Sequence, residues 1–399
     1  MSQMDVFDVV VVGGGPAGAT AAHELAQRGR SVLLLDRDGR IKPCGGAIPP
    51  RAIKDFAIPD HMLVARATSA RMVAPSDMQV DMPVGNGYVG MVDREHFDEW
   101  LRERAEQVGA ERRTGTFECI TRDDQPGAIV HYFAGEQRNK SDPAAVRARV
   151  VIGADGARSA VARQEIKGAE KMKFVFAYHE IIKAPQGEMT DYDPQRCDVY
   201  YQGKMSPDFY SWIFPHGDTM SVGTGTMQKG FSLRGSVAQL REATGLSKVE
   251  TIRREGAPIP LKPLKRWDNG RDVVLAGDAA GVVAPASGEG IYYAMAGGQL
   301  AADAAEGLCA TGNVKSLATA RRRFMKDHGR VFMVLGIMQY FWYSSDKRRE
   351  KFVKICQDPD VQRLTWEAYM NKKLVKAQPK AHVKIFFKDM AHLLGFATT

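Results

Sequence analysis

The sequence predicts an α/β fold: a Rossmann-like nucleotide-binding domain, an inserted, mainly antiparallel β-sheet domain and a helical C-terminal region. Three observations predict it. A continuous β-branched strand, Val9–Val12, runs into a glycine-rich turn and a stretch of good helix formers. Residues 148–163 and 272–298 repeat the order of apolar strand and Gly/Asp turn. The last part of the chain contains an apolar, aromatic segment at 331–343 that suits a buried or interfacial helix.

The first unit has the order strand, turn, helix, strand, acid. GGGPAG, residues 13–18, has GxGxxG spacing and opens a helix expected over Ala17–Gln27. A second strand, Val32–Leu35, ends at Asp36. In such units a pyrophosphate rests on the helix N-terminus and the acid holds a ribose hydroxyl. A carboxylate at position 36 would repel the 2′-phosphate of NADP, which favours FAD or NAD.

The two later turns lie at residues 153–156 and 277–281. Each could be an ordinary connection between a strand and a helix, because Gly and Asp are the commonest turn residues. Three such turns in one chain favour a single extended ligand, contacted at its adenosine, pyrophosphate and ribityl parts, whereas an NAD site needs only the first turn.

GGGPAG at 13–18, GADGARS at 153–159 and AGDAAG at 276–281 resemble, in order and spacing, the FAD-binding motifs of a known flavoprotein family. That family includes aromatic-ring hydroxylases, flavin halogenases and geranylgeranyl reductases. The resemblance covers most of the first 300 residues. It implies a Rossmann-like FAD-binding domain.

The resemblance also implies roles for individual residues. Asp36 is expected to hold the adenosine ribose, and Asp278 to bind the ribityl chain. Asp155 and Gly156 are expected in the turn near the pyrophosphate and an incoming nicotinamide. The full set of expected FAD-binding residues is Gly13, Gly15, Ala17, Gly18, Asp36, Arg37, Cys44, Gly45, Asp155, Gly156, Asp278, Gly281, Gly288 and Gly290.

Three further stretches resemble the geranylgeranyl reductases of chlorophyll and bacteriochlorophyll synthesis, with the nearest likeness to the bacteriochlorophyll branch. They are KPCGGAIP at 42–49, FYSWIFPHGDTMSVGTGT at 209–226 and PASGEG at 285–290. The resemblance implies saturation of three double bonds of a geranylgeranyl group, on bacteriochlorophyll or on diphosphate, to give a phytyl group. The chain has no second dinucleotide-binding unit that would indicate a nicotinamide cofactor. The expectation that NADPH is the reductant therefore comes from the resemblance to the family.

Tyr210, Trp212 and Phe214 alternate in sequence, which places three rings on one face of a strand that an HGD turn reverses into the next. Such a stripe is equally typical of an ordinary β-sheet core. An aliphatic polyprenyl chain would also need an apolar wall, so we expect these three residues to bind substrate.

Saturation of an isolated alkene requires a proton donor, because no neighbouring carbonyl stabilises the charge left by hydride attack. The candidates are Cys44, Glu289, Tyr292, Tyr293 or an ordered water, and we select Cys44, Glu289 and Tyr293 as catalytic. Cys44 lies between Pro43 and two glycines. An ordinary surface loop with an incidental cysteine also fits that stretch.

Charge is distributed unevenly along the chain of 399 residues. From Arg321 onward there are 17 Lys and Arg against 7 Asp and Glu, so this +10 exceeds the net +8 of the whole chain. Such a tail suits an anionic membrane face, a nucleic acid or a solvated helix pair, and no nucleic-acid motif accompanies it. We expect a cytoplasmic protein whose tail associates peripherally with the inner or photosynthetic membrane. Pigment-synthesis proteins are expected partners, and nucleic acid is not.

Five cysteines without CxxC spacing and nine histidines without paired-ligand spacing indicate no metal site. The expected FAD-binding domain comprises residues 1–70, 92–170 and 266–325. The substrate domain comprises 71–91 and 171–265, and the helical region 326–399. Two other functions stay open: a flavin monooxygenase or halogenase acting on an apolar substrate, and a flavin-bearing membrane scaffold without turnover.

Overall fold

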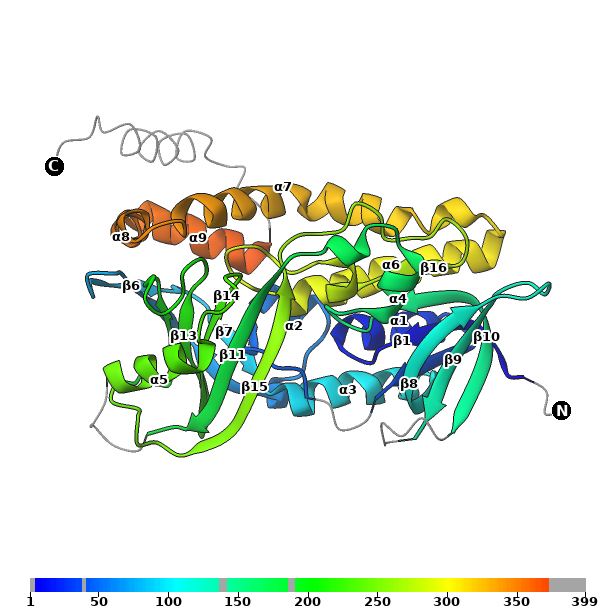
Figure 1. Cartoon of the computed structure of the whole chain (residues 1–399), viewed down its shortest axis with the longest axis horizontal. Helices are drawn as coiled ribbons and strands as arrows, with labels where there is room; N and C mark the ends of the chain where they lie inside the picture. The colour runs from blue at the N-terminus through cyan, green and yellow to red at the C-terminus, as the bar shows by residue number, and fades with distance from the viewer. Residues whose placement is uncertain (1–3, 38–40, 136–141, 186–190, 373–399) are drawn as a thin grey trace.

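Two large sheets lie side by side, and helices from distant parts of the chain pack on them (Figure 1). The computed structural model describes residues 4–37, 41–135, 142–185 and 191–372. All statements below concern these residues.

The first sheet has a parallel core in the order β8–β2–β1–β10–β16. The strand β9 pairs antiparallel with residues 115–121 of β8 and with residues 143–148 of β10. Residues 9–12 of β1 and residues 32–35 of β2 are unbroken apolar runs because both faces of these strands are covered. Its strands are β1 (Val6–Val12), β2 (Val32–Asp36), β8 (Glu111–Thr121), β9 (Ala128–Ala134), β10 (Pro143–Gly153) and β16 (Val273–Leu275).

The helix α1 follows β1 and packs between α3 and α6 (Figure 1). Asp93 caps α3 by accepting a hydrogen bond from the Glu95 backbone. The short α4 begins after Ser159, whose side chain caps it. The helices of this half are α1 (Pro16–Gln27), α3 (Arg94–Gln107), α4 (Ala160–Glu165) and α6 (Ile291–Thr311).

The second sheet has the order β15–β11–β14–β13–β12–β5–β6, antiparallel except where β12 pairs parallel with β5. The helix α5 packs on β11 and β14. The chain enters this sheet twice, through residues 69–83 and 174–260. Its elements are β5 (Ser69–Val73), β6 (Gln79–Pro83), β11 (Phe174–Lys183), β12 (Arg196–Tyr200), β13 (Ser211–His216), β14 (Thr219–Thr226), β15 (Thr251–Pro260) and α5 (Leu233–Ala243).

A small sheet in the order β3–β7–β4 connects the two halves. It consists of β3 (Ala47–Ile48), β4 (Leu63–Ala67) and β7 (Val89–Val92), with the helix α2 (Pro50–Asp55) following β3. The loop that carries Cys44 leads directly into β3, so both halves of the molecule position it.

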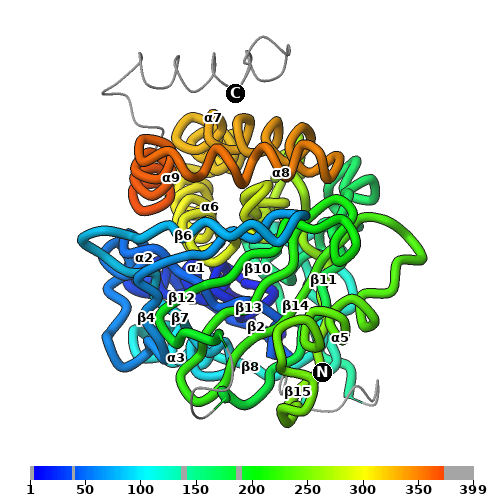
Figure 2. Tube along the Cα trace, turned by 90° about the vertical axis from the view of Figure 1, so that its left-hand side faces the viewer, coloured from blue at the N-terminus to red at the C-terminus, as the bar shows by residue number. Residues whose placement is uncertain are grey.

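Three C-terminal helices cover one side of the molecule, above α6 (Figures 1 and 2). The long α7 packs on α6 and extends toward the second sheet, and α9 contacts α2. They are α7 (Thr319–Trp342), α8 (Asp346–Ile355) and α9 (Pro359–Asn371). The predicted fold class is confirmed, whereas the domain boundaries stay a prediction. The tail beyond residue 372 lies outside the described residues.

Candidate active site

The first glycine turn joins β1 to α1 in a geometry that requires glycine. Gly13 has a positive φ of 104°, and a Cβ on Gly18 would lie 1.8 Å from the Gly13 carbonyl oxygen. Gly15 is the N-cap of α1, and a Cβ there would meet nothing within 4 Å. The N-terminus of α1 therefore faces open space, where its free backbone N–H groups can bind a phosphate.

Asp36 ends β2 beside this turn. Burial raises the pKa of its carboxyl group, and hydrogen bonds from the backbone of Gly14 and Arg37 oppose that rise. Arg102 of α3 approaches the same place, with Nη1 3.3 Å from the Gly14 carbonyl oxygen and 3.5 Å from Asp36 Oδ2. The Arg37 side chain is exposed. The sequence did not predict that Arg102 lies at this site, because it is one of many charged residues on a polar helix.

The second turn abuts the first, since the Ala154 backbone N–H donates to the Val12 carbonyl oxygen at 2.8 Å. The Asp155 carboxylate accepts from the Ser159 hydroxyl and from the Ala160 backbone at 2.6 Å. It therefore caps α4, and burial raises its pKa. Gly156 has a positive φ of 85°, with open space at its Cβ position.

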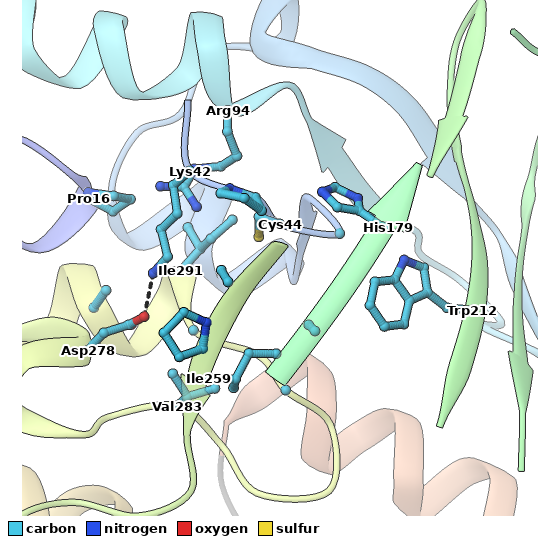
Figure 3. A pocket seen from close by; sticks show the side chains of 18 residues that line it. Pro16, Lys42, Cys44, Arg94, His179, Trp212, Ile259, Asp278, Val283 and Ile291 are labelled. Carbon is cyan, nitrogen blue, oxygen red and sulfur yellow. Dashed lines mark hydrogen bonds and ion pairs between the residues drawn. The ribbon is translucent and has the colours of Figure 1, made fainter. Parts of the chain in front are cut away.

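The third turn carries Asp278, which forms an ion pair with Lys42 (Figure 3). Asp278 is buried and lies in a 3₁₀ turn over Gly277–Ala280. Gly281 closes that turn with a positive φ of 82°, where a Cβ would lie 2.4 Å from the Lys262 carbonyl oxygen. Gly281 thus shapes the turn, whereas Asp278 presents a carboxylate. Ala17 of α1 packs against the start of this turn, since a Cβ on Gly277 would lie 2.7 Å from Ala17 Cβ.

A pocket of about 90 Å³ lies between the third turn, the loop around Cys44 and the second sheet (Figure 3). Its walls come from segments that are far apart in the sequence, and most of its lining is apolar. The lining includes Lys42, Cys44, Gly45, Arg94, His179, Trp212, Ile259, Asp278, Gly288 and Gly290.

Cys44 lies beside a buried ion pair of α3. Arg94 donates two hydrogen bonds to Asp98, at 2.7 and 2.6 Å. Burial disfavours the charged guanidinium, but Asp98 and the Cys44 thiol outweigh this effect and raise the pKa of Arg94. The Gly46 backbone N–H points at Cys44 Sγ from 3.4 Å. The thiol is therefore fixed by polar neighbours, and the sequence did not indicate this role for Arg94.

The three expected aromatic residues lie in a row on β13 and the residue before it. Ring centroids are 6.0 Å apart for Tyr210 and Trp212, and 6.2 Å for Trp212 and Phe214. Trp212 lines the pocket, whereas Phe214 packs against Gly45, where a Cβ would lie 3.0 Å from its ring. The Tyr210 hydroxyl donates to the Ser287 carbonyl oxygen at 2.6 Å. The row thus connects the second sheet to the loop over 285–290.

Glu289 and Tyr293, two of the expected catalytic residues, do not line this pocket. The Glu289 carboxylate pairs with Lys372 at the end of α9. Tyr293 packs in the core, with its ring centroid 4.9 Å from that of Phe332. Lys372 was not expected, because it lies in a run of basic residues that reads as solvated.

The residues of the three turns can be tested for their fit to a cofactor. Among the described residues, no group of His, Cys, Asp and Glu could hold a metal ion. The open space at Gly15 and the carboxylates of Asp36 and Asp278 fit an extended dinucleotide with a phosphate at its centre. These residues would hold FAD.

The family model described as FAD binding domain matches residues 6–319, so the chain belongs to this family of FAD-binding proteins. Curated relatives narrow the family further. The chain is 59% identical over 391 residues to the geranylgeranyl diphosphate reductase of Rhodobacter capsulatus, covering 98% of each chain. It is 36% identical to the geranylgeranyl diphosphate reductase of Synechocystis sp., also over 98% of each chain. Within the family, the chain is a member of the geranylgeranyl reductases.

Solved structures share the fold at lower identity. A geranylgeranyl bacteriochlorophyll reductase-like protein from Thermoplasma acidophilum superposes with a TM-score of 0.81 at 22% identity, covering 95% of this chain and all of that one. The flavin-dependent brominase Bmp2 gives 0.76 at 19%, covering 98% and 100%. The fold is therefore common to reductases and halogenases, and the relatives with high sequence identity are reductases. The predicted family membership and enzyme class are confirmed.

Proposed function

We propose that this enzyme uses NADPH to saturate three double bonds of a geranylgeranyl group, giving a phytyl group. The group is carried by diphosphate or by bacteriochlorophyll. Gly15, Asp36 and Asp278 would hold FAD, which would supply hydride-transfer chemistry at the pocket. A monooxygenase or halogenase is not favoured, since the relatives of high identity are named as reductases. A membrane scaffold without turnover is not favoured for the same reason.

The observation that carries the proposal is the pocket, where the Asp278 turn faces an apolar wall with Trp212 in it. An aliphatic chain gains contact area on such a wall without a strong polar anchor. It can therefore slide between rounds of reduction, which a substrate with three reducible double bonds requires. The head group would stay outside a pocket of this size.

Proton donation is the second requirement of the reaction. Hydride cannot readily attack an isolated alkene first, so protonation must lead or accompany it. Cys44 lies at the pocket surface beside Arg94, which makes it a candidate donor. Trp212 lines the pocket from the second sheet, and its ring would stabilise positive charge that develops on the more substituted carbon.

The C-terminal helices supply a candidate membrane face. Met333, Ile337 and Tyr340 are 61%, 62% and 86% exposed and recur at helical spacing along α7. We call these three residues the α7 ridge. Exposed basic residues flank it, Arg330 before it and Lys347 after it. An apolar ridge between cations suits the surface of an anionic bilayer, and no helix of the described residues is long and apolar enough to cross one.

The decisive experiment combines genetics and reconstitution. We expect deletion of the gene in its host to leave geranylgeranylated pigment, which the purified protein with FAD and NADPH converts through partly reduced intermediates under anaerobic conditions. Normal phytylated pigment in the deletion strain would overturn the proposal. Parallel assays with geranylgeranyl diphosphate and with the extracted pigment identify the head group. Stoichiometric oxygen consumption would instead indicate a monooxygenase.

A further inference from the structure

The α9 helix ends in a residue that reaches into the protein. Lys372 adopts a left-handed backbone conformation with φ of 53°, and its side chain is 2% exposed. Its ammonium group pairs with Glu289, which is 5% exposed, and lies 3.8 Å from the ring centroid of Tyr369. The Asn371 carbonyl oxygen accepts a hydrogen bond from Arg51 of α2. The end of α9 is thus fixed from two sides.

A buried ion pair of this kind is a weak source of stability, because removing two charges from water offsets most of their attraction. Moreover, Glu289 Oε1 is buried and has no hydrogen-bond partner among the described residues. Burial raises the pKa of Glu289 and lowers that of Lys372, and their mutual attraction opposes both shifts. A proton can therefore move within the pair at a lower free-energy cost than in two separate, solvated groups.

The pair lies between two cavities. Gly288 and Gly290, on either side of Glu289, line the pocket described above. Tyr292, whose ring centroid is 5.9 Å from the Lys372 nitrogen, lines a second, open cavity of about 1060 Å³ between α1, α2, α6 and α7. On the pocket side, both Cys44 and Glu289 influence the pKa of Tyr210, which burial raises.

We propose that Lys372 positions and recharges Glu289, and that this pair passes protons from the second cavity toward the reaction pocket. The inference depends on the proposed reductase function. Each saturation breaks one C=C π bond and forms two C–H bonds, one with a hydride that originates from NADPH and one with a proton. The Glu289 carboxyl group releases that proton toward the pocket, where Cys44 is the group that can pass it to the alkene. Lys372 restores the proton to Glu289, and solvent in the second cavity reprotonates Lys372. NADPH leaves as NADP⁺, so the step balances.

The groups that face the pair come from four parts of the fold. They are Arg51 of α2, Tyr210 beside β13, Tyr292 and Tyr293 of α6, and Tyr369 of α9. His328 of α7 packs on Tyr293, with ring centroids 5.3 Å apart.

The test separates the two half-reactions by stopped-flow absorbance of bound FAD. In Lys372→Met we expect reduction by NADPH to stay within about twofold of wild type. Reoxidation by geranylgeranyl diphosphate should slow at least about tenfold, with a larger solvent deuterium isotope effect. Lys372→Arg should not restore the rate, because a guanidinium retains the charge but does not give up its proton. Lys354→Met, which removes an exposed lysine of α8, is the matched control.

A second readout needs no turnover. Infrared spectra should show a protonated carboxyl band that grows in Lys372→Met and disappears in Glu289→Gln. Equal slowing of both half-reactions, or wild-type rates together with an unchanged infrared band, would overturn the inference. If Lys372→Met does not fold, Lys372→Arg and Glu289→Gln carry the same comparison. If wild type is not reoxidised by any geranylgeranyl substrate, the reductase proposal fails, and the infrared measurement still tests the pair.

Discussion

Arg94 and Asp98 form a doubly hydrogen-bonded pair, one turn apart on α3, in which both side chains are almost completely buried. The pair lies beside Cys44 and next to the reaction pocket. Because the carboxylate compensates the buried guanidinium, its removal would leave a charge without a partner.

We predict that Asp98→Asn lowers the free energy of unfolding by about 3–5 kcal/mol, the usual effect of breaking a buried pair by removing one partner. The matched control is Asp55→Asn, which breaks an i,i+4 pair with Arg51 at the surface. That change should lower the free energy of unfolding by less than about 1 kcal/mol. Denaturant unfolding of both variants measures the difference. Similar losses in the two would show that burial of the α3 pair has no special effect.

A second prediction concerns cofactor retention. Asp278→Ala should weaken FAD binding about tenfold or more, because it removes a buried carboxylate from the third turn. Asp124→Ala removes an exposed carboxylate and serves as the control. Flavin content after purification and titration of the apoprotein with FAD measure the effect. An unchanged affinity in folded Asp278→Ala would contradict the assignment of this turn.

Local patterns were sufficient to predict the parts of the fold that depend on near neighbours. The helix expected over Ala17–Gln27 begins one residue earlier, at Pro16, which suits the first position of a helix because its missing N–H would have no intrahelical partner. The strand expected over Val9–Val12 extends back to Val6. Glycine and proline set these boundaries locally, so the sequence contains the necessary information.

Residues that depend on tertiary contacts could not be predicted in the same way. Lys372 and Glu289 are 83 positions apart, and the surrounding basic run favours a solvated side chain. Arg102 and Arg94 lie on a helix with a polar composition, and only the packing of α3 against the first turn and the Cys44 loop gives them a role. The expected roles of Glu289 and Tyr293 depend on which way the start of α6 faces, which periodicity alone does not determine.

His216 provides a prediction about pH. Burial lowers its pKa from 6.5 to about 4, so the ring is neutral in the folded protein at pH 5. It packs against Gly46, where a Cβ would lie 2.6 Å from Nε2. In the unfolded chain the ring binds a proton below pH 6.5. Between pH 6.5 and 4 the unfolded state therefore binds more protons, and stability falls as pH falls.

The expected loss from this group over that interval is about 2–3 kcal/mol. His216→Gln should remove this part of the pH dependence, so the difference in unfolding free energy between wild type and variant should change between pH 7 and pH 4. Replacement of the exposed His61 by Gln is the control for loss of an imidazole. Thermal or urea unfolding across this range provides the data. A constant difference between wild type and His216→Gln would show that the ring does not titrate as described.

The last prediction tests the α7 ridge as a membrane face. Replacing Met333, Ile337 and Tyr340 by Ser should reduce binding to vesicles of phosphatidylcholine and phosphatidylglycerol at least about tenfold, because three exposed apolar side chains no longer enter the interface. Binding of wild type should also weaken as salt rises, because screening reduces the attraction between the flanking cations and anionic lipid.

The control for the ridge carries Ser at Val6, Met227 and Ile252, which are also exposed but belong to other elements. Vesicle flotation of the three proteins, each with bound FAD, measures the effect. Because the ridge side chains point into solvent, we expect all three proteins to keep the same flavin content and the same rate of reduction by NADPH. Equal flotation of wild type and the ridge variant would show that this face of α7 does not contact the bilayer.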